Sequence, residues 1–530
     1  PVKLARPTDA VIYEMHVRDF RIHPSSGVPA ATRGKYLGVV QAGARSPGGA
    51  QTTLDHLVEL GVTHVHLLPV FDYGTGDETE PAERYSWFNW GYDPVLYNCP
   101  EGSYASSPDG IARQREFKEI VMALHRQGIG VVLDCVFNHT FQTGGAPFSV
   151  FDKVFPGYFY RQDPDGTYAN GSGCLNEVAS ERPMARRFIL DSIRHWLREY
   201  HVDGFRFDLM GLHDTGTMRA LAAEAKKINS SVLLYGEGWD MGNILPPEKK
   251  MMQRNVPGSG LAAFNDGIRD NLKGDVFDAR SAGFVQGAGP WLGLDRLKQQ
   301  LMGASTGRGA EGIPVGAPGE TVNYVSCHDN LCLMDKLAAT LPDAPISERL
   351  RRARLALAMV VTAQGIPFLH LGDEFGRDKN GVENSFSNND PAVNPVDWSS
   401  KAEHRAQFDY VRGLLWLRRE HPAFRMTSAA MVQKHMVFLE GLPENVVGFV
   451  LKDHANEDRW RRILVVYNGT PEAHTLPVAG KWRVVADGDK AGPATLYTSL
   501  RKVQVAPFAP LVAYEPIEWE KISPKKPTEY

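Results

Sequence analysis

The sequence of 530 residues lacks a hydrophobic run near the ~18 residues that span a membrane, and it lacks a surplus of positive charge. Lys and Arg total 58 against 62 Asp and Glu, which gives a net charge of −4 and a pI of about 6.5. Proteins that bind nucleic acid usually carry a basic surplus or stripe. We therefore expect neither a nucleic-acid nor a membrane partner. Hydrophobic residues at 43% and charged residues at 23% are ordinary globular usage.

Cysteine is scarce, odd in number and widely spaced. The five residues are Cys99, Cys135, Cys174, Cys327 and Cys332, with no CxxC pair and no Cys/His zinc spacing. We expect reduced, buried or half-buried thiols and no metal centre. This favours a cytoplasmic location. The chain starts with Pro1 and has no leader pattern, so secretion remains the alternative if a leader was removed. We also expect a monomer.

Three catalytic signatures are absent. The sequence has no Walker A loop, no G-x-G-x-x-G after a predicted strand, and no G-x-S-x-G elbow. These absences disfavour phosphoryl transfer, dinucleotide-dependent redox chemistry and serine hydrolysis.

Short apolar segments alternate with helical patterns as far as about residue 420. The predicted strands are Val11–Val17, His64–Val70, Ile129–Val136, Asp203–Asp208, Ser231–Gly236, Leu261–Phe264, Thr321–Ser326 and Pro367–Leu371. The predicted helices are 50–60, Ile111–Gln127, Met184–Tyr200, 215–228, Glu348–Ala363 and His404–Glu420. This order predicts a parallel α/β fold. Polar residues follow the strand ends, as on the rim of a (β/α)8 barrel, which favours a barrel over an open doubly wound sheet.

The domain pattern changes near residue 425. We predict a catalytic barrel over 1–424, with long loops at 71–110 and 140–182, because such long irregular segments are usually functional. Short strands with turns follow, starting at Val432–Leu439, and predict an antiparallel β-sandwich over 425–522. Residues 523–530 read as an exposed tail.

The segment Gly204-Phe205-Arg206-Phe207-Asp208 brings a cation and a carboxylate together. Residues two apart on a strand share a face, so Arg206 and Asp208 point the same way. The guanidinium would keep Asp208 ionised, as a nucleophile requires. A purely structural ion pair is an equally good reading of this segment alone. One βα unit later, Glu237 lies between glycines that allow close approach of a ligand, and we consider it a general acid.

Two further strand ends carry polar side chains. His328 and Asp329 follow one strand and are suited to binding sugar hydroxyls, with an Asx turn as the alternative. Asn138 and His139 follow another. A lone Asn carbonyl is a possible calcium ligand, but no oxygen-rich loop accompanies it, so substrate contact or loop anchoring ranks above metal binding. Two carboxylates on one rim meet the requirement for glycoside hydrolysis.

Four segments in this order resemble the α-amylase superfamily of retaining glycosidases. They are DCVFNH (134–139), GFRFDLMG (204–211), GEGWD (236–240) and SCHDN (326–330). Further segments are similar to type I pullulanases: YEMHVRDF (13–20), NWGYDP (89–94), YNCPEGSY (97–104), GSGCLNE (171–177), GDE (372–374) and NSF (384–386). The likeness covers roughly residues 8–420.

The resemblance implies a role for each matching residue. Asp208 would be the nucleophile, Glu237 the general acid/base and Asp329 the transition-state stabiliser. Substrate-binding residues would be Tyr92, His139, Arg206, Trp239, His328 and Asn384, while Asp134 would be mainly architectural. The implied reaction is hydrolysis of α-1,6 branch links in pullulan, limit dextrins and branched glucans such as starch and glycogen, with retention.

The sequence departs from these pullulanases at three positions. Phe88 stands where Tyr is common, Leu175 where a second Gly is common, and Asp373 where Gln is common. The 7 residues before position 8 are too few for the glycan-binding modules that many relatives carry, which leaves open whether modules are lacking or removed.

Three functional alternatives remain. One is an isoamylase-like glycogen debranching enzyme, and another is an α-1,4-acting neopullulanase or α-amylase. The third, from a different class, is a catalytically inactive glucan-binding protein. All three carboxylates are retained, which argues against the last. No cofactor is expected to be required, and calcium is possible without being indicated.

Overall fold

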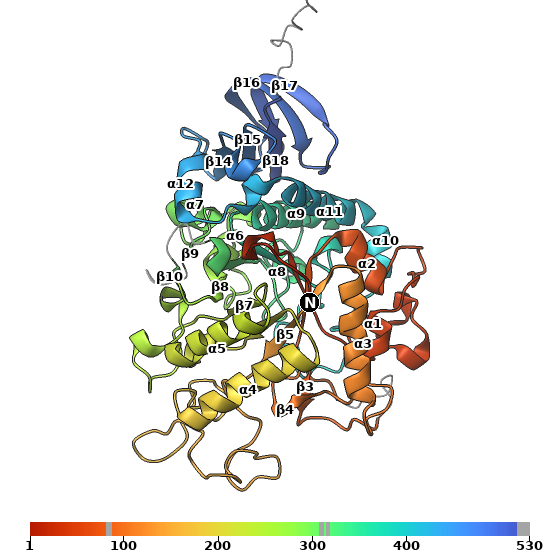
Figure 1. Cartoon of the computed structure of the whole chain (residues 1–530). Coiled ribbons are helices and arrows are strands. Elements are labelled where there is room, and N and C mark those ends of the chain that lie inside the picture. The colour runs from red at the N-terminus through yellow and green to blue at the C-terminus, as the bar shows by residue number, and fades with distance from the viewer. Residues whose placement is uncertain (81–86, 307–311, 314–317, 517–530) are drawn as a thin grey trace, which may run out of the picture.

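The centre of the computed structural model is a closed barrel of eight parallel strands (Figure 1). The model describes residues 1–80, 87–306, 312–313 and 318–516, so the predicted tail at 523–530 lies outside the described residues. The barrel strands are β1 (Ile12–Met15), β2 (His64–Leu67), β5 (Gly130–Cys135), β6 (Gly204–Phe207), β7 (Leu233–Gly236), β8 (Ala262–Asn265), β11 (Thr321–Asn323) and β12 (Ile366–His370). Each overlaps a predicted strand, and β12 pairs with β1 to close the ring. The barrel prediction is confirmed.

The apolar sequence of these strands follows from burial on two sides. All six residues of β5 are buried, because its inner face lines the barrel and its outer face meets helices. The inner cluster includes Ile12, Val132, Phe264 and Phe368. The outer residues join a larger cluster shared with the helices.

The helices form the outer ring. They are α2 (Thr53–Leu60), α3 (Ala112–Arg126), α4 (Pro183–Glu199), α5 (Thr215–Ile228), α6 (Asp266–Lys273), α7 (Leu294–Leu301), α8 (Leu333–Thr340), α9 (Ile346–Thr362) and α11 (Arg405–Glu420), with shorter α1 (Tyr36–Val39) and α10 (Ser399–Glu403). The six predicted helices are all present. Helices α6, α7 and α8 were not predicted: each has eight residues and shows few turns of periodicity, although α2 of the same length was found.

The two long loops leave the same end of the barrel. The first holds an antiparallel pair, β3 (Phe71–Tyr73) and β4 (Pro94–Pro100), which the sequence reasoning missed. The second, 140–182, contains bridges between Tyr160 and Val178 and between Gln162 and Tyr168. It lies at the lower edge of Figure 1, beside α4. A small pair, β9 (Ser305–Thr306) and β10 (Gly312–Ile313), completes the loop strands.

The C-terminal part is antiparallel, as predicted. Its strands are β13 (Met436–Phe438), β14 (Val446–Leu451), β15 (Ile463–Asn468), β16 (His474–Ala486), β17 (Tyr497–Val505) and β18 (Ala509–Tyr514), hydrogen-bonded into one six-stranded sheet. One face joins the cluster shared with α9, and the other forms a separate core around Trp482. The sheet therefore has two buried faces. Where the two domains divide stays a prediction.

The strand predicted at Val432–Leu439 is wrong in its first half. Helix α12 (Ala429–His435) precedes the three-residue β13. The Ser428 side chain accepts a hydrogen bond from the N–H of Met431 and caps this helix, a local signal that outweighed the apolar residues.

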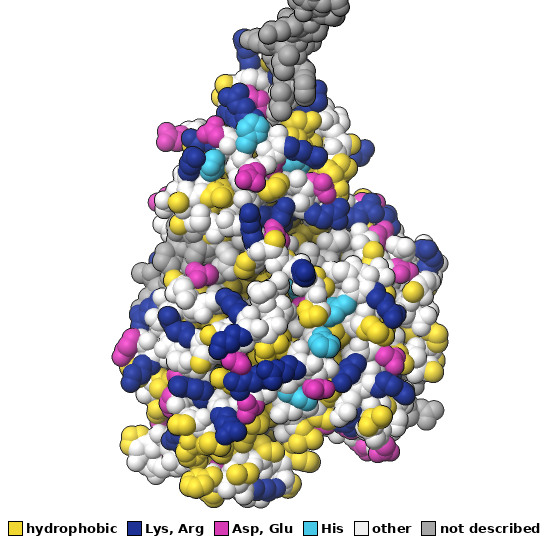
Figure 2. Space-filling model, viewed as in Figure 1, with side chains coloured by type: hydrophobic (Ala, Val, Ile, Leu, Met, Phe, Trp, Pro, Cys, Tyr) yellow, Lys and Arg dark blue, Asp and Glu magenta, His cyan; other side chains and the backbone are white. Residues whose placement is uncertain are grey.

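The surface carries mixed charges (Figure 2), and the cysteines, all within the described residues, form no disulfide. Figure 2 shows basic, acidic and apolar side chains interspersed over one face. No helix in the described part of the chain is long and apolar enough to cross a membrane. All five cysteines are free. Cys174 is exposed, so the expectation of buried or half-buried thiols is wrong for this residue. Its loop faces the cleft described below.

Arg418 of α11 ties several chain segments together. It is buried, and its guanidinium donates to the carbonyl oxygens of Thr8, Val361, Ala363, Gly365 and Phe424. We predict that Arg418→Leu lowers the free energy of unfolding by about 3 kcal/mol or more, since several buried carbonyls lose their partner. Urea unfolding measures this. The neighbouring, exposed Arg419→Leu is the control, with a change below about 0.5 kcal/mol. Equal effects of the two variants would contradict the assignment.

Candidate active site

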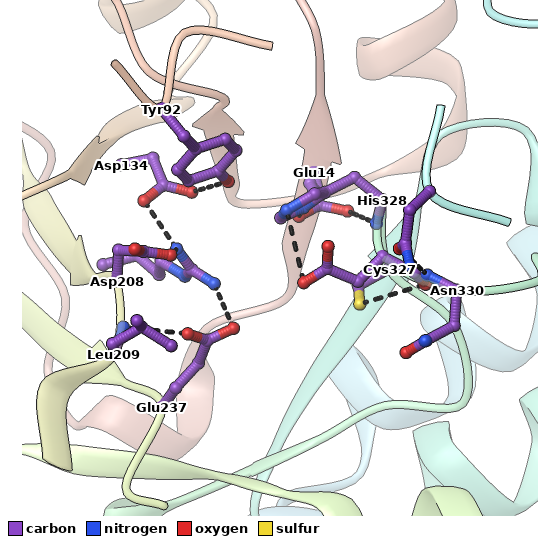
Figure 3. Close-up of polar contacts among 12 residues, drawn as sticks. Glu14, Tyr92, Asp134, Asp208, Leu209, Glu237, Cys327, His328 and Asn330 are labelled. Carbon is purple, nitrogen blue, oxygen red and sulfur yellow. Dashed lines mark hydrogen bonds and ion pairs between the residues drawn. The ribbon is translucent and has the colours of Figure 1, made fainter. Parts of the chain in front are cut away.

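Arg206 of β6 is the centre of the site. Its Nη1 lies 2.7 Å from Asp208 Oδ1 and 2.8 Å from Asp134 Oδ1 on the neighbouring β5, and its Nη2 donates to Glu237 Oε1 after β7. The guanidinium is 2% exposed. The prediction that Arg206 and Asp208 share a face is confirmed, and one cation joins the ends of three adjacent strands (Figure 3).

Glycines bring these strand ends together. A Cβ on Gly211 would lie 1.7 Å from the carbonyl oxygen of Trp239, and the Gly211 N–H donates to Glu237 O at 2.8 Å. A Cβ on Gly236 would meet Phe207 O at 2.5 Å, and one on Gly238 would meet the Gln253 nitrogen at 2.8 Å. These glycines make room for the protein's own backbone, and Gly238 also lines the cleft described below. The expected close approach of a ligand beside Glu237 stays a prediction.

Glu237 is held from two sides. Its Oε2 accepts the backbone N–H of Leu209 at 2.8 Å, while Oε1 accepts from Arg206. Leu209 has φ 40°, in the left-handed region that is unfavourable for a leucine. Strain of this kind persists where the surroundings enforce it, and it often marks a functional site. Here it aims the Leu209 N–H at the Glu237 carboxyl group.

The pKa of Glu237 is strongly perturbed. Burial raises it, and the nearby Asp208 and Asp329 add to this effect, so that the pKa reaches about 8 despite the opposing attraction of Arg206. Glu237 is therefore protonated at neutral pH and can give up a proton.

Asp208 is held differently. Besides Arg206, its Oδ2 accepts from Asn138 Nδ2 at 2.7 Å. Asn138 also donates to the Asp208 carbonyl oxygen at 3.0 Å, so it anchors this loop as one of our two preferred readings expected. Two hydrogen bonds, one to each oxygen, thus fix the Asp208 carboxyl group beside the shared cation.

Asp134 lies behind this pair. Burial disfavours its charged form, but Arg206 and His66 outweigh that effect and lower its pKa to about 2. Its Oδ2 accepts from Tyr92 OH at 2.7 Å and lies 3.1 Å from His66 Nε2. Asp134 is fully buried, as its architectural expectation requires.

Tyr92 and His139 form one wall of the site. The Tyr92 ring stacks on the His328 ring with centroids 5.2 Å apart and an interplanar angle of 20°. His139 Nε2 lies 2.8 Å from the Tyr92 carbonyl oxygen, and Nδ1 contacts Asn138. Both ring nitrogens of His139 thus have protein partners. A contact of His139 with a sugar stays a prediction, whereas its support of Tyr92 is plain.

His328 and Asp329 lie next to Tyr92, whose ring stacks on that of His328. His328 Nε2 lies 3.6 Å from Asp329 Oδ2, and its Nδ1 lies 2.7 Å from Glu14 Oε1 on β1. Asp329 is the most exposed of the three candidate catalytic carboxylates, at 36% of its side chain. The next residue, Asn330, has φ 60° and donates its backbone N–H to Asn384 Oδ1 at 3.0 Å.

A cleft of about 1050 Å³ opens above these groups. Of the predicted site residues, it is lined by Tyr92, Trp239, Asp329 and Asn384, whereas Asp208 and Glu237 lie beneath. Sequence reasoning did not assign a substrate-binding role to the other aromatic residues that line the cleft, which are Phe88, Trp90, Phe141, Phe277 and Phe386. Aromatic rings beside polar edges suit the flat faces of sugars.

Leu175, where a second glycine is common in pullulanases, has a backbone conformation that suits glycine better. It has φ 68° and is 80% exposed. A glycine adopts this conformation without strain, whereas leucine does not.

One group of acidic side chains in the described residues is close enough to share a metal ion: Asp72, Glu78 and Glu101. Arg113 already contacts Asp72 and Glu78. Burial raises the pKa of Glu101 to about 8, which makes it a poor ligand at neutral pH. The group lies outside the cleft lining.

The sequence of the chain is similar to those of known proteins. Residues 432–490 match the family model described as "Pullulanase, all-beta domain". The chain is 42% identical to the pullulanase of Bacillus subtilis (strain 168) over 492 residues, covering 92% of this chain and 67% of that protein.

Solved structures agree. The pullulanase from Bacillus acidopullulyticus superposes with a TM-score of 0.90 at 43% identity, covering 97% of this chain and 61% of that one. The pullulanase from Paenibacillus barengoltzii, solved with maltohexaose and α-cyclodextrin, gives a TM-score of 0.90 at 42% identity, covering 97% and 78%. The chain thus spans about three fifths to four fifths of these relatives.

The raised pKa of Glu237 has a consequence for stability. Between about pH 4.5 and 8 the unfolded chain releases this proton and the folded chain keeps it, so this group lowers stability by about 1.4 kcal/mol per pH unit as pH rises. Glu237→Gln removes this slope. We predict that its free energy of unfolding, relative to wild type, increases from pH 5 to pH 8 in urea titrations. Parallel pH curves for the two proteins would show that Glu237 has no raised pKa.

Proposed function

Because the chain belongs to the pullulanase family, we propose that it hydrolyses α-1,6-glucosidic branch linkages in pullulan, limit dextrins and branched α-glucans, with retention of configuration. The observation that carries the proposal is the Arg206 guanidinium, which contacts both Asp208 and Glu237 beneath the cleft. A retaining glycosidase needs one ionised and one protonated carboxyl group at the scissile bond. Burial raises the pKa of Glu237 to about 8, which supports its role as the protonated group.

In the first step, Glu237 transfers its proton to the glycosidic oxygen while Asp208 attacks the anomeric carbon. The bond to the leaving sugar breaks, and an ester bond forms between the glucosyl unit and Asp208. In the second step, the ionised Glu237 takes a proton from water, whose oxygen displaces Asp208. Both carboxyl groups return to their starting states. The mechanism requires them to lie ~5 Å apart, which stays a prediction.

The remaining residues hold the sugar. Asp329, exposed in the cleft, accepts hydrogen bonds from sugar hydroxyls and stabilises the positive charge of the transition state. Tyr92 stacks on the glucose whose bond is cleaved, and Trp239 on the leaving side. Arg206, His139 and His328 complete the same subsite, and Asn384 contributes from the cleft wall.

The alternatives differ in bond or in chemistry. An isoamylase-like or α-1,4-acting enzyme would use the same carboxylates, so only products separate them. An inactive glucan-binding protein would need the aromatic cleft but not the divided charge states of Asp208 and Glu237. The family relationship favours α-1,6 cleavage.

We further propose that the protein works as a monomer in the cytoplasm and without a resident metal or other cofactor. The mechanism assigns every proton transfer and the nucleophile to side chains of this chain. In the described residues, one set of three acidic side chains lies close enough together to share a cation, and Arg113 already contacts two of them, Asp72 and Glu78.

Product analysis tests the bond specificity. Digestion of pullulan should give maltotriose as the sole small product, at the same rate with EDTA present. Panose or isopanose would instead indicate α-1,4 cleavage. Absence of any product from pullulan and from short branched oligosaccharides alike would contradict the enzymatic proposal.

Replacement of the nucleophile tests the mechanism. We predict that Asp208→Asn lowers kcat on pullulan by about a thousandfold or more while maltotriose still binds, because the amide cannot attack carbon. Calorimetry and reducing-sugar assays measure both quantities. Asp203→Asn is the matched control, since Asp203 is a buried carboxylate near the start of the same strand. Turnover by the folded control should stay near wild type. Comparable kcat losses in the two variants would contradict the assignment.

A further inference from the structure

Strand β1 contains an acidic residue, Glu14, to which the mechanism gives no role. Glu14 is 1% exposed. It is level with His66 on β2 and with His370 on β12 in the strand register. It does not line the cleft, but it lies directly behind His328 (Figure 3). A buried carboxylate at this position needs partners to compensate for the loss of water.

Both oxygens of Glu14 point at one residue. Oε2 accepts the backbone N–H of His328 at 2.8 Å, and Oε1 lies 2.7 Å from His328 Nδ1. An ionised carboxylate only accepts hydrogen bonds, so Nδ1 carries a hydrogen. Glu14 thus holds His328 by its main chain and by its ring at once.

The other ring nitrogen of His328 is turned toward Asp329, which lines the cleft. With Nδ1 turned to Glu14, Nε2 lies 3.6 Å from Asp329 Oδ2. The ring plane also supports Tyr92, which stacks on it, while the Trp90 ring meets its edge with centroids 4.9 Å apart. A rotation of the His328 ring would therefore disturb both the hydrogen-bond donor and the stacking platform.

We propose that Glu14 is the positioning residue of His328: by accepting hydrogen bonds from both the backbone N–H and the ring Nδ1–H, it directs a charged Nε2–H donor into the cleft beside Asp329. A charged donor there binds a sugar hydroxyl that Asp329 also contacts, and keeps that pair oriented. This inference rests on the proposed function, because it concerns the sugar held by the same site.

Charged groups reach His328 from every neighbouring element. They are Glu14 on β1, Asp134 on β5, Arg206 on β6, Asp329 on its own loop, His370 on β12, and Lys379, whose Nζ donates to the His328 carbonyl oxygen at 2.9 Å. Burial acts against protonation of His328, but Asp329 and Glu14 outweigh it and raise its pKa to about 9. Burial lowers the pKa of His370 well below its usual value, so that ring adds no competing charge.

A double-mutant cycle separates positioning from general stability. Wild type, Glu14→Gln, His328→Asn and the double variant are compared by kcat and KM on the glucan that wild type cleaves. If Glu14 acts through His328, each single variant loses about 10–100-fold in kcat/KM, and the double variant loses within about threefold of His328→Asn alone. If Glu14 acts independently, the losses multiply, which would overturn the proposal.

Titration of the His328 ring supplies a second readout. Removing the Glu14 charge makes His328 lose its proton at lower pH, so the His328 ring signals in an NMR titration, identified by their loss in His328→Asn, should titrate about one pH unit lower in Glu14→Gln. Glu14→Asp keeps the charge and should restore most of that shift. An unmoved His328 titration in Glu14→Gln would contradict the proposal even if the activity of this variant is low.

Glu116→Gln is the matched control, because Glu116 is also buried and also accepts a backbone N–H, that of Ser106. It should lower the melting temperature without moving the titration of His328. If Glu14→Gln fails to fold, Glu14→Asp still tests the coupling through the same cycle. Activity of wild type on pullulan decides the proposed function beforehand. Failure of the cycle in an active enzyme therefore counts against Glu14 alone.

Discussion

The contact of one buried guanidinium with three carboxyl groups organises this molecule. Arg206 joins Asp134, Asp208 and Glu237, which come from three consecutive barrel strands. A buried cation is tolerated only where anions surround it, and it keeps Asp134 ionised in return. Burial, helped by the nearby Asp208 and Asp329, raises the pKa of Glu237 so that this residue keeps its proton. The suitability of Glu237 as the acid follows from this environment.

The barrel was predictable because its strands are buried on both faces and therefore consist of continuous apolar segments in the sequence. Periodicity located all eight of them and six of the helices. It failed for α6, α7 and α8, which have eight residues each, and for the β3–β4 pair, which joins segments about 20 residues apart inside a loop. At Val432–Leu439 a serine cap prevailed over β-forming residues, a signal that could have been recognised.

The site was predictable in membership more than in contacts. The spacing of Arg206 and Asp208 on one strand determined their common face, and the strand ends determined the common rim. Sequence could not show that Glu14, 314 positions before His328, binds it through both oxygens, because β1 reaches the segment that follows β11 only when the barrel closes. Nor could it show that the glycines beside Glu237 make room for neighbouring backbone, a tertiary contact that no local pattern encodes.

The central claim is that Arg206 and its neighbours leave Asp208 as the ionised nucleophile and Glu237 as the protonated acid. Trapping the covalent intermediate tests it most directly. The protein is incubated with a maltooligosyl fluoride carrying a second fluorine on the reacting ring, which slows breakdown of the ester, and the peptides are then analysed by mass spectrometry. The account predicts the sugar mass on the peptide that contains Asp208, linked to that residue. A sugar ester on Glu237, or none during turnover of the reagent, would contradict it.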